Sequence, residues 1–324
     1  MGIVITDRIA VIGLGRWGRH YVRVLTALGA TVVACHTRRA DDDARWLAEH
    51  HPTVRHTTSL SEALDDQVDG VAVVVPRQSH ADLTMACLRR GVHVLVEKPA
   101  VTTRTDVDRI HGEARTRGLV LHTGYTHRFD SSLRQMVSVA RRTAAPGWQF
   151  TWRKPSPGVG VADLIWEYFP HVFSIAELFG GDEAGDLRPT RVRAVPGPRG
   201  TGTVAVDLPT RAGPWRVVVS SDAGARQKHI DLYDGGRLVA EWSDRHLHDH
   251  RGDRVLVAAE EPLLCQVRDF LRAVQAPRPG TYHALDALVT SRLVELSTMA
   301  GPSAATADSP EGSAVSYAPS DGEG

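Results

Sequence analysis

Apolar runs alternate with amphipathic segments along the first 123 residues of the chain. Short β-branched runs occupy residues 8–13, 31–35, 70–75, 92–96 and 119–122. Nearly continuous runs of this kind are typical of parallel strands that are covered on both faces. Helical patterns separate them at residues 19–28, 40–51, 60–64, 81–90 and 105–118. Strands that alternate with helices predict an α/β domain with a doubly wound parallel sheet over residues 1–123.

In the second half of the chain, apolar and polar residues alternate instead. A helix is predicted for residues 130–142, and strands rich in Val, Trp and Thr follow at 148–154, 190–195, 201–208, 215–221, 226–233 and 236–242. Asp234-Gly235-Gly236 is a hairpin signal between the last two strands. These strands predict an α+β domain with an open, largely antiparallel sheet over residues 124–300. Residues 301–324 are rich in small and acidic residues and are expected to form a disordered tail.

A glycine motif follows the first predicted strand. Gly13-Leu14-Gly15-Arg16-Trp17-Gly18 has the spacing G-x-G-x-x-G and stands between a strand and a helix. In this setting Gly13 permits a tight turn, Gly15 lets the backbone approach a pyrophosphate, and Gly18 allows close helix–strand packing. The phosphates would lie on the helix N-terminus, beside Arg16 and Trp17. The motif therefore predicts dinucleotide binding.

The end of the second predicted strand bears on which dinucleotide is bound. This position commonly carries an acid that binds the adenosine ribose, but here the chain reads His36-Thr37-Arg38-Arg39. An acid would repel a 2′-phosphate, whereas Thr37, Arg38 and Arg39 can bind one. The sequence thus favours NADP(H) over NAD(H). The alternative is that Arg38 and Arg39 are solvated and open the next helix.

Lys98 stands where an apolar strand ends. Residues 92–99 read Val-His-Val-Leu-Val-Glu-Lys-Pro, and Pro99 forces the chain to turn there. A lysine in this position is costly to bury unless it has a partner or a task. The chain also avoids lysine, because positions 98, 154 and 228 hold the only three among 38 basic residues. We therefore predict that Lys98 is the reaction centre, at the sheet edge where Gly13, Thr37 and Pro76 also fall.

Glu167 and His171 stand four residues apart in the second half. Pro170 suits the first turn of a helix that runs through Phe179, and both side chains could point into one cavity. A histidine with a pKa near neutrality is a natural proton carrier for alcohol–ketone chemistry. Two alternatives stay open, namely a hydrogen-bonded core histidine at 171 and an acid at 167 that is favoured by the helix dipole.

The composition excludes several classes of partner. The 324 residues carry a formal net charge of +0 without a long basic stripe, so neither nucleic acid nor a membrane surface is expected as a partner. No apolar run approaches the ~20 residues of a membrane helix, and no secretion signal precedes the first strand. Cys35, Cys87 and Cys265 are odd in number and widely spaced, which favours a reducing cytoplasm. The histidines at 246, 248 and 250 stand in a predicted polar loop and lack the further ligands of a closed site, so no metal is expected.

Together these motifs resemble the glucose–fructose oxidoreductase / inositol dehydrogenase / rhizopine-catabolism family (Gfo/Idh/MocA). The likeness covers roughly residues 8–300. It rests on the glycine motif, Pro76 with His80, Glu97-Lys98-Pro99, Gly124-Tyr125 with Arg128-Phe129, Trp166-Glu167 with Pro170-His171, and Glu261-Pro262-Leu263. The resemblance implies a Rossmann domain and a second domain whose open sheet face often builds oligomers. We expect a homodimer or homotetramer through that face, in or near which lie Trp148, Trp152, Trp215 and Trp242.

The resemblance also implies roles for individual residues. Lys98 matches the family's catalytic lysine, with a cis peptide bond to Pro99, and would polarise the substrate oxygen. Glu167 and His171 match the family's Asp-x-x-x-His, with an acid one methylene longer. His171 would be the general acid/base, and Glu167 would orient Lys98 or His171. Further residues are implied in the cofactor site (Pro76, His80 and Glu97, the last at the nicotinamide ribose) and as substrate contacts (Tyr125, Arg128, Trp152 and Arg153).

These observations predict an NADP(H)-dependent oxidoreductase of a small, sugar-like or natural-product substrate. NADPH usually supplies reducing power, so a ketoreductase in a bacterial biosynthetic pathway is favoured. The motif His-x-x-Ser-Ile at residues 171–175 resembles that of a branch of the family that acts on nucleotide-linked or modified sugars. The alternatives are an NAD(P)-dependent sugar or cyclitol dehydrogenase, an imine reductase and a catalytically silent nucleotide sensor.

Overall fold

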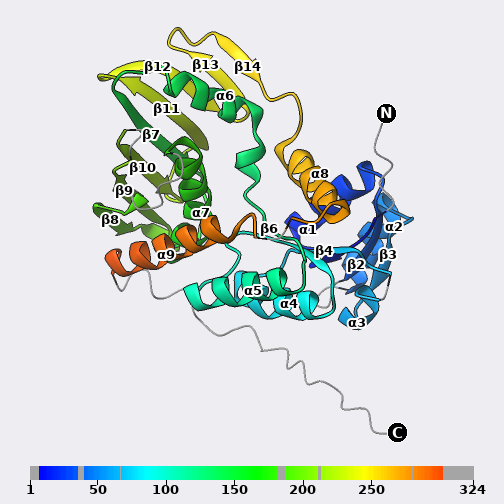
Figure 1. Cartoon of the computed structure of the whole chain (residues 1–324). Helices are drawn as coiled ribbons and strands as arrows, with labels where there is room; N and C mark the ends of the chain where they lie inside the picture. The colour runs from blue at the N-terminus through cyan, green and yellow to red at the C-terminus, as the bar shows by residue number, and fades with distance from the viewer. Residues whose placement is uncertain are drawn as a thin grey trace, which may run out of the picture.

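Two sheets lie side by side in the computed structural model, with helices between and around them (Figure 1). The structure describes residues 7–35, 40–65, 67–180, 187–210, 213–278 and 280–301. The candidate residues Thr37, Arg38 and Arg39 lie outside these ranges, as does the predicted tail beyond Gly301. Within the described ranges, none of the helices is both long enough and apolar enough to cross a membrane.

The first sheet has six parallel strands in the order β3-β2-β1-β4-β5-β6. Its strands are β1 (Arg8–Ile12), β2 (Thr31–Cys35), β3 (Arg55–Thr57), β4 (Gly70–Val73), β5 (His93–Val96) and β6 (Leu121–Thr123). The intervening helices are α1 (Arg16–Ala27), α2 (Ala40–His50), α3 (Leu60–Ala63), α4 (His80–Arg89) and α5 (Arg104–Thr116). The doubly wound sheet that the sequence predicted is confirmed, and the short β3 is an addition to it.

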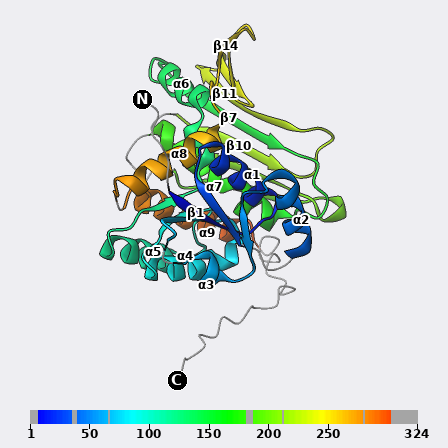
Figure 2. The same ribbon diagram turned by 90° about the vertical axis from the view of Figure 1, so that its right-hand side faces the viewer.

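The two faces of this sheet are covered by different helices (Figures 1 and 2). Apolar residues of α4 and α5 pack on one face, and those of α1 and α8 (Pro262–Gln275) pack on the other. The α8 residues Leu263, Val267 and Phe270 are each no more than 3% exposed. A division of the chain at residue 123 therefore assigns α8 to the second half, although its apolar side packs on the first sheet.

The second sheet has eight strands in the order β14-β13-β12-β11-β7-β10-β9-β8. They are β7 (Pro146–Arg153), β8 (Arg191–Pro196), β9 (Gly202–Leu208), β10 (Trp215–Ser220), β11 (Gln227–Asp234), β12 (Arg237–Ser243), β13 (His246–Asp249) and β14 (Arg254–Val257). All neighbours are antiparallel except β7 and β10, which confirms the largely antiparallel sheet. The segment around residues 246–257, expected to be a polar loop, is a hairpin.

Helices α6 (Ser131–Ala140) and α7 (Val161–Gly180) pack on one face of this sheet, and α9 (His283–Met299) packs on α7 and adds to the same core. Trp148, Trp215 and Trp242 point into that core and are no more than 3% exposed. These tryptophans therefore do not support an oligomer interface on the open face, and the oligomeric state stays a prediction.

Helix α7 begins earlier than the sequence suggested, because its apolar stripe starts before Pro170. Leu164, Ile165 and Phe169 are fully buried and extend the stripe backwards to Val161. Pro170 is therefore inside the helix and not in its first turn. A proline has no N–H to donate, so the carbonyl of Trp166 lacks its usual helical partner. This interruption lies next to the residue that meets Lys98.

Candidate active site

The glycine motif forms a tight turn at the start of α1. Gly13 has φ +99°, and a Cβ at this residue would lie 2.3 Å from the Val74 carbonyl oxygen. A Cβ on Gly18 would lie 1.8 Å from the Gly13 carbonyl oxygen, so both positions require glycine. Gly15, in contrast, caps α1 with open space around it, and Arg16 and Trp17 beside it are exposed. This open helix N-terminus fits the pyrophosphate of a dinucleotide.

The strand ends next to this turn are held by Glu97 and His80. The Glu97 carboxylate accepts hydrogen bonds from the Tyr21 hydroxyl at 2.7 Å and from the Lys98 N–H at 3.1 Å. Burial raises the pKa of Glu97, and Lys98 opposes that shift. His80 is 1% exposed, and its ring nitrogens lie 2.8 Å from the Pro99 carbonyl and 2.9 Å from the Val75 carbonyl. Both ring nitrogens therefore face backbone carbonyls of the turn. The buried His80 ring lies behind the surface that is open to the cofactor.

Lys98 follows β5 and reaches the second half of the chain. Its peptide bond to Pro99 is cis. The Lys98 ammonium donates to the Glu167 carboxylate at 3.0 Å and to the Glu167 carbonyl at 2.9 Å. The same carboxylate lies 3.5 Å from Arg77, whose guanidinium stacks over Trp166. One half-exposed carboxylate is thus shared by two largely buried cations.

His171 lies next to this group on α7 and is 9% exposed. Its ring packs edge-to-face on His127, with centroids 4.8 Å apart, and also on Trp152 at 5.7 Å. Its Nδ1 is buried without a hydrogen-bond partner in the described part of the chain, which leaves Nε2 for a substrate. Burial, followed by the charge of Lys98, lowers the pKa of His171 well below its ordinary value.

The predicted substrate contacts divide into two groups. Trp152 lies against His171, and Arg153 is exposed at the end of the same strand. Tyr125 is 1% exposed, and its hydroxyl donates to Asp286 at 2.8 Å, so it belongs to the core. Arg128 donates to the Ser174 carbonyl at 2.7 Å and is paired with Glu177. Of the four residues, only Trp152 contacts the proposed acid/base.

Three residues that lie around Glu167 and His171 were absent from the predicted set, namely Arg77, His127 and Lys228. Arg77 directly follows Pro76, and His127 directly precedes Arg128, so each stands beside a chosen residue. Lys228 carried a signal of its own, because it is one of three lysines in a chain with 38 basic residues. Its strand position gave no indication that it would approach His171.

Comparison with known proteins finds a family that matches the first domain of the chain. Residues 8–125 match the family model GFO_IDH_MocA, described as an oxidoreductase family with an NAD-binding Rossmann fold. The first domain is similar to this oxidoreductase family. A UDP-N-acetylglucosamine 3-dehydrogenase of Acidithiobacillus ferrooxidans is 26% identical over 84% of this chain and 90% of that protein. Its solved structure superposes with a TM-score of 0.74 over 91% of this chain and 98% of that one, at 23% identity.

Other known proteins match part of the chain or its fold. A 4-carboxy-2-hydroxymuconate-6-semialdehyde dehydrogenase of Sphingobium sp. is 35% identical, but over only 39% of this chain and 40% of that protein. A mutant 3-ketoreductase of Actinomadura kijaniata, solved with TDP-benzene and NADP, has a TM-score of 0.75 at 21% identity, covering 90% of this chain and 97% of that one. At this identity the likeness concerns the fold alone.

Proposed function

We propose that the protein transfers hydride between the nicotinamide of NADP(H) and a CH–OH or C=O carbon of a sugar-like substrate, as a ketoreductase. The observation that carries the proposal is the Lys98 ammonium, held 3.0 Å from Glu167 beside His171 and at the sheet edge that bears the glycine turn. The family supports a nicotinamide dinucleotide as cofactor. NADP(H) is preferred on the strength of Thr37, Arg38 and Arg39 in the sequence.

In this mechanism the bound nicotinamide would supply or accept the hydride. The side chains stabilise the charge on the substrate oxygen and exchange its proton. Lys98 directs its ammonium at that oxygen, where negative charge develops during reduction. Glu167 fixes the ammonium by accepting two hydrogen bonds from it, one at a side-chain oxygen and one at the backbone carbonyl. His171 exchanges the proton of the substrate oxygen through Nε2.

Oxidation of a hydroxyl is the second candidate, and the state of His171 favours it. Burial and the nearby ammonium of Lys98 lower the pKa of His171, so its imidazole is neutral at neutral pH. A neutral imidazole is ready to accept a proton from a substrate hydroxyl. In the reductive direction the ring must first be protonated, so we expect ketone reduction to be faster at acidic pH.

The test combines cofactor binding with turnover. We expect NADPH to bind more tightly than NADH in a fluorescence titration. We expect Lys98→Met to lower turnover by roughly 10²–10³-fold across a panel of keto sugars, cyclitols and nucleotide sugars, with little change in cofactor affinity. Lys154→Met is the matched control and should turn over like the wild type. Tighter binding of NADH would overturn the cofactor preference, and wild-type rates in Lys98→Met would overturn the mechanism.

A further inference from the structure

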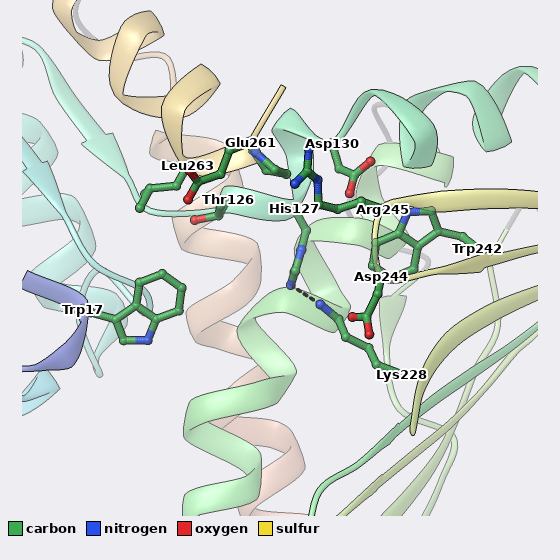
Figure 3. A pocket seen from close by; sticks show the side chains of 11 residues that line it. Trp17, Thr126, His127, Asp130, Lys228, Trp242, Asp244, Arg245, Glu261 and Leu263 are labelled. Atoms are coloured by element: carbon green, nitrogen blue, oxygen red, sulfur yellow. Dashed lines mark hydrogen bonds between the residues drawn. The ribbon is translucent and has the colours of Figure 1, made fainter. Parts of the chain in front are cut away.

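A cavity of about 220 Å³ lies between the second sheet and the start of α8. We call it the Lys228 pocket. Its wall includes His127, Lys228, Trp242 and Arg245, and it extends as far as Trp17 at the dinucleotide turn (Figure 3). His127 belongs to both the pocket and the active site, because its ring packs on His171. A molecule that reacts at His171 can therefore extend into the pocket.

Lys228 is held in the pocket by aromatic rings. Its ammonium lies 4.3 Å from the centroid of Trp152 and 5.1 Å from that of Trp242. It also donates to Nε2 of His127 at 3.1 Å (Figure 3). An ammonium has three N–H donors, and within the described ranges the Lys228 ammonium donates no second hydrogen bond. Donors are thus left over on a cation that is largely withdrawn from water.

Both cations of the pocket lie beyond ion-pairing distance of the acids that the structure describes, although burial lowers the pKa of Lys228 and the charges of Asp244 and Asp130 act to raise it. Within the residues that the structure describes, Lys228 and Arg245 form no ion pair. Arg245 donates to the Ala258 carbonyl at 2.9 Å, which leaves its charge uncompensated. Asp244 and Arg245 form the two-residue turn between β12 and β13, where φ of 41° and 75° suits a type I′ hairpin turn, and this turn places Arg245 at the pocket.

The acids around the pocket are engaged elsewhere. Glu261 pairs with Arg23 at 2.6 Å, and Asp244 pairs with Arg226 at 3.4 Å. Asp130 caps α6, since its Oδ1 accepts from the backbone of residues 132 and 133, while its Oδ2 is buried without a partner. When Arg23 and Arg226 are counted beside the acids they pair with, Asp130 alone is left to offset Lys228 and Arg245, so the charges around the pocket sum to a net positive value.

We propose that Lys228 and Arg245 bind an anionic group of the substrate, a carboxylate or a phosphate, while the reacting carbon lies at His171 and Lys98. An anion would take up the spare donors of both side chains, and charge-assisted hydrogen bonds of this kind are the strong ones. It would also offset the cost of holding an ammonium between two indoles. The inference rests on the proposed function, and it narrows the substrate to acidic or phosphorylated sugar-like molecules.

Binding can be measured directly because the chain has three lysines, at 98, 154 and 228. Lysine labelled with ¹³C at Cε gives one NMR signal for each, assigned with Lys154→Arg and Lys228→Arg. Burial lowers the pKa of Lys228 to about 8, so its signal should titrate near that pH. We expect millimolar inorganic phosphate or acetate to shift the Lys228 signal saturably and to raise its titration midpoint, while the Lys154 signal stays. The probe that binds more tightly identifies the group as phosphate or carboxylate.

The kinetic test uses substrate pairs that differ only in charge, such as a sugar with its uronic acid or its phosphate. We expect Lys228→Gln and Arg245→Gln to raise KM for the charged member at least tenfold relative to the neutral one, with kcat less affected, and Lys154→Gln to change neither. An unmoved Lys228 signal, or equal KM changes for both members, would overturn the anion site. Absence of turnover in the wild type, with phosphate still bound at Lys228, would overturn the proposed function alone.

Discussion

Glu167 holds the Lys98 ammonium with two of its oxygens. Its carboxylate and its carbonyl both accept from Lys98, and the carboxylate also lies near Arg77. The family pattern has an aspartate here, and the extra methylene still allows a 3.0 Å contact with Lys98. The resemblance to the family implied that Glu167 orients Lys98 or His171, and its carboxylate lies on Lys98. The sequence could not predict the contact between Arg77 and the same carboxylate, because that contact depends on how two distant segments pack.

Glu167→Gln should lower kcat roughly tenfold, because the charge-assisted hydrogen bond to Lys98 becomes a neutral one. NADPH affinity should remain unchanged, since the Glu167 side chain contacts Lys98 and Arg77 and not the glycine turn. Steady-state kinetics and fluorescence titration check the two expectations. Asp163→Asn, in the first turn of the same helix, is the control. A Glu167→Gln enzyme with the rate of the wild type would contradict the role given to this carboxylate.

At the scale of elements, one aspartate connects α9 to the first sheet. Asp286 is fully buried and accepts from His111 of α5, from the Thr123 hydroxyl of β6 and from the Tyr125 hydroxyl, each at 2.8 Å. The remaining residues of α9 pack mainly against the second core. The helix thus joins the second core to the first sheet, and Asp286 sets its position against that sheet.

Replacing Asp286 with asparagine should destabilise the protein by about 2 kcal/mol, because a charged acceptor for three buried donors is lost. The measurement is equilibrium unfolding in urea, followed by circular dichroism. Asp108→Asn serves as the control, since Asp108 lies exposed on α5 and pairs with His283. Equal stability of the Asp286→Asn variant and the wild type would show that the network contributes little.

The elements themselves were predicted with uneven success, for physical reasons. Period and composition predicted the parallel strands and most helices, because burial on both faces leaves a continuous apolar run. The start of α7 was missed, since Pro170 is a common signal for a first helical turn. The strands β13 and β14 were missed as well, because their charged and histidine-rich sequence resembles a loop.

At the scale of the whole molecule, buried histidines should make the protein sensitive to acid. Burial lowers the pKa of His80, His127 and His171, and it lowers that of His122 to about 4. Unfolded histidines take up protons near pH ~6.5, so the unfolded state binds more protons than the folded one below that value. Stability present above pH ~6.5 is then lost progressively as the pH falls towards 4.

The melting temperature should accordingly fall between pH 6.5 and 4, as measured by differential scanning fluorimetry across that range. A His122→Gln variant should lose less of its melting temperature over the same interval, because one of the depressed groups is gone. His250→Gln, at an exposed histidine, should follow the wild-type curve. A flat wild-type profile over this interval would argue against neutral buried histidines.

The return of α8 to the first sheet has a consequence for synthesis on the ribosome. Residues 124–261 are made after β6 and before α8, which at ordinary translation rates takes on the order of 10 s. During this interval all six strands exist, but the surface that Leu263, Val267 and Phe270 will cover stays bare. The nascent chain therefore carries an unfinished apolar face while its second half is being made, and chaperones have a defined target and a defined period in which to bind it.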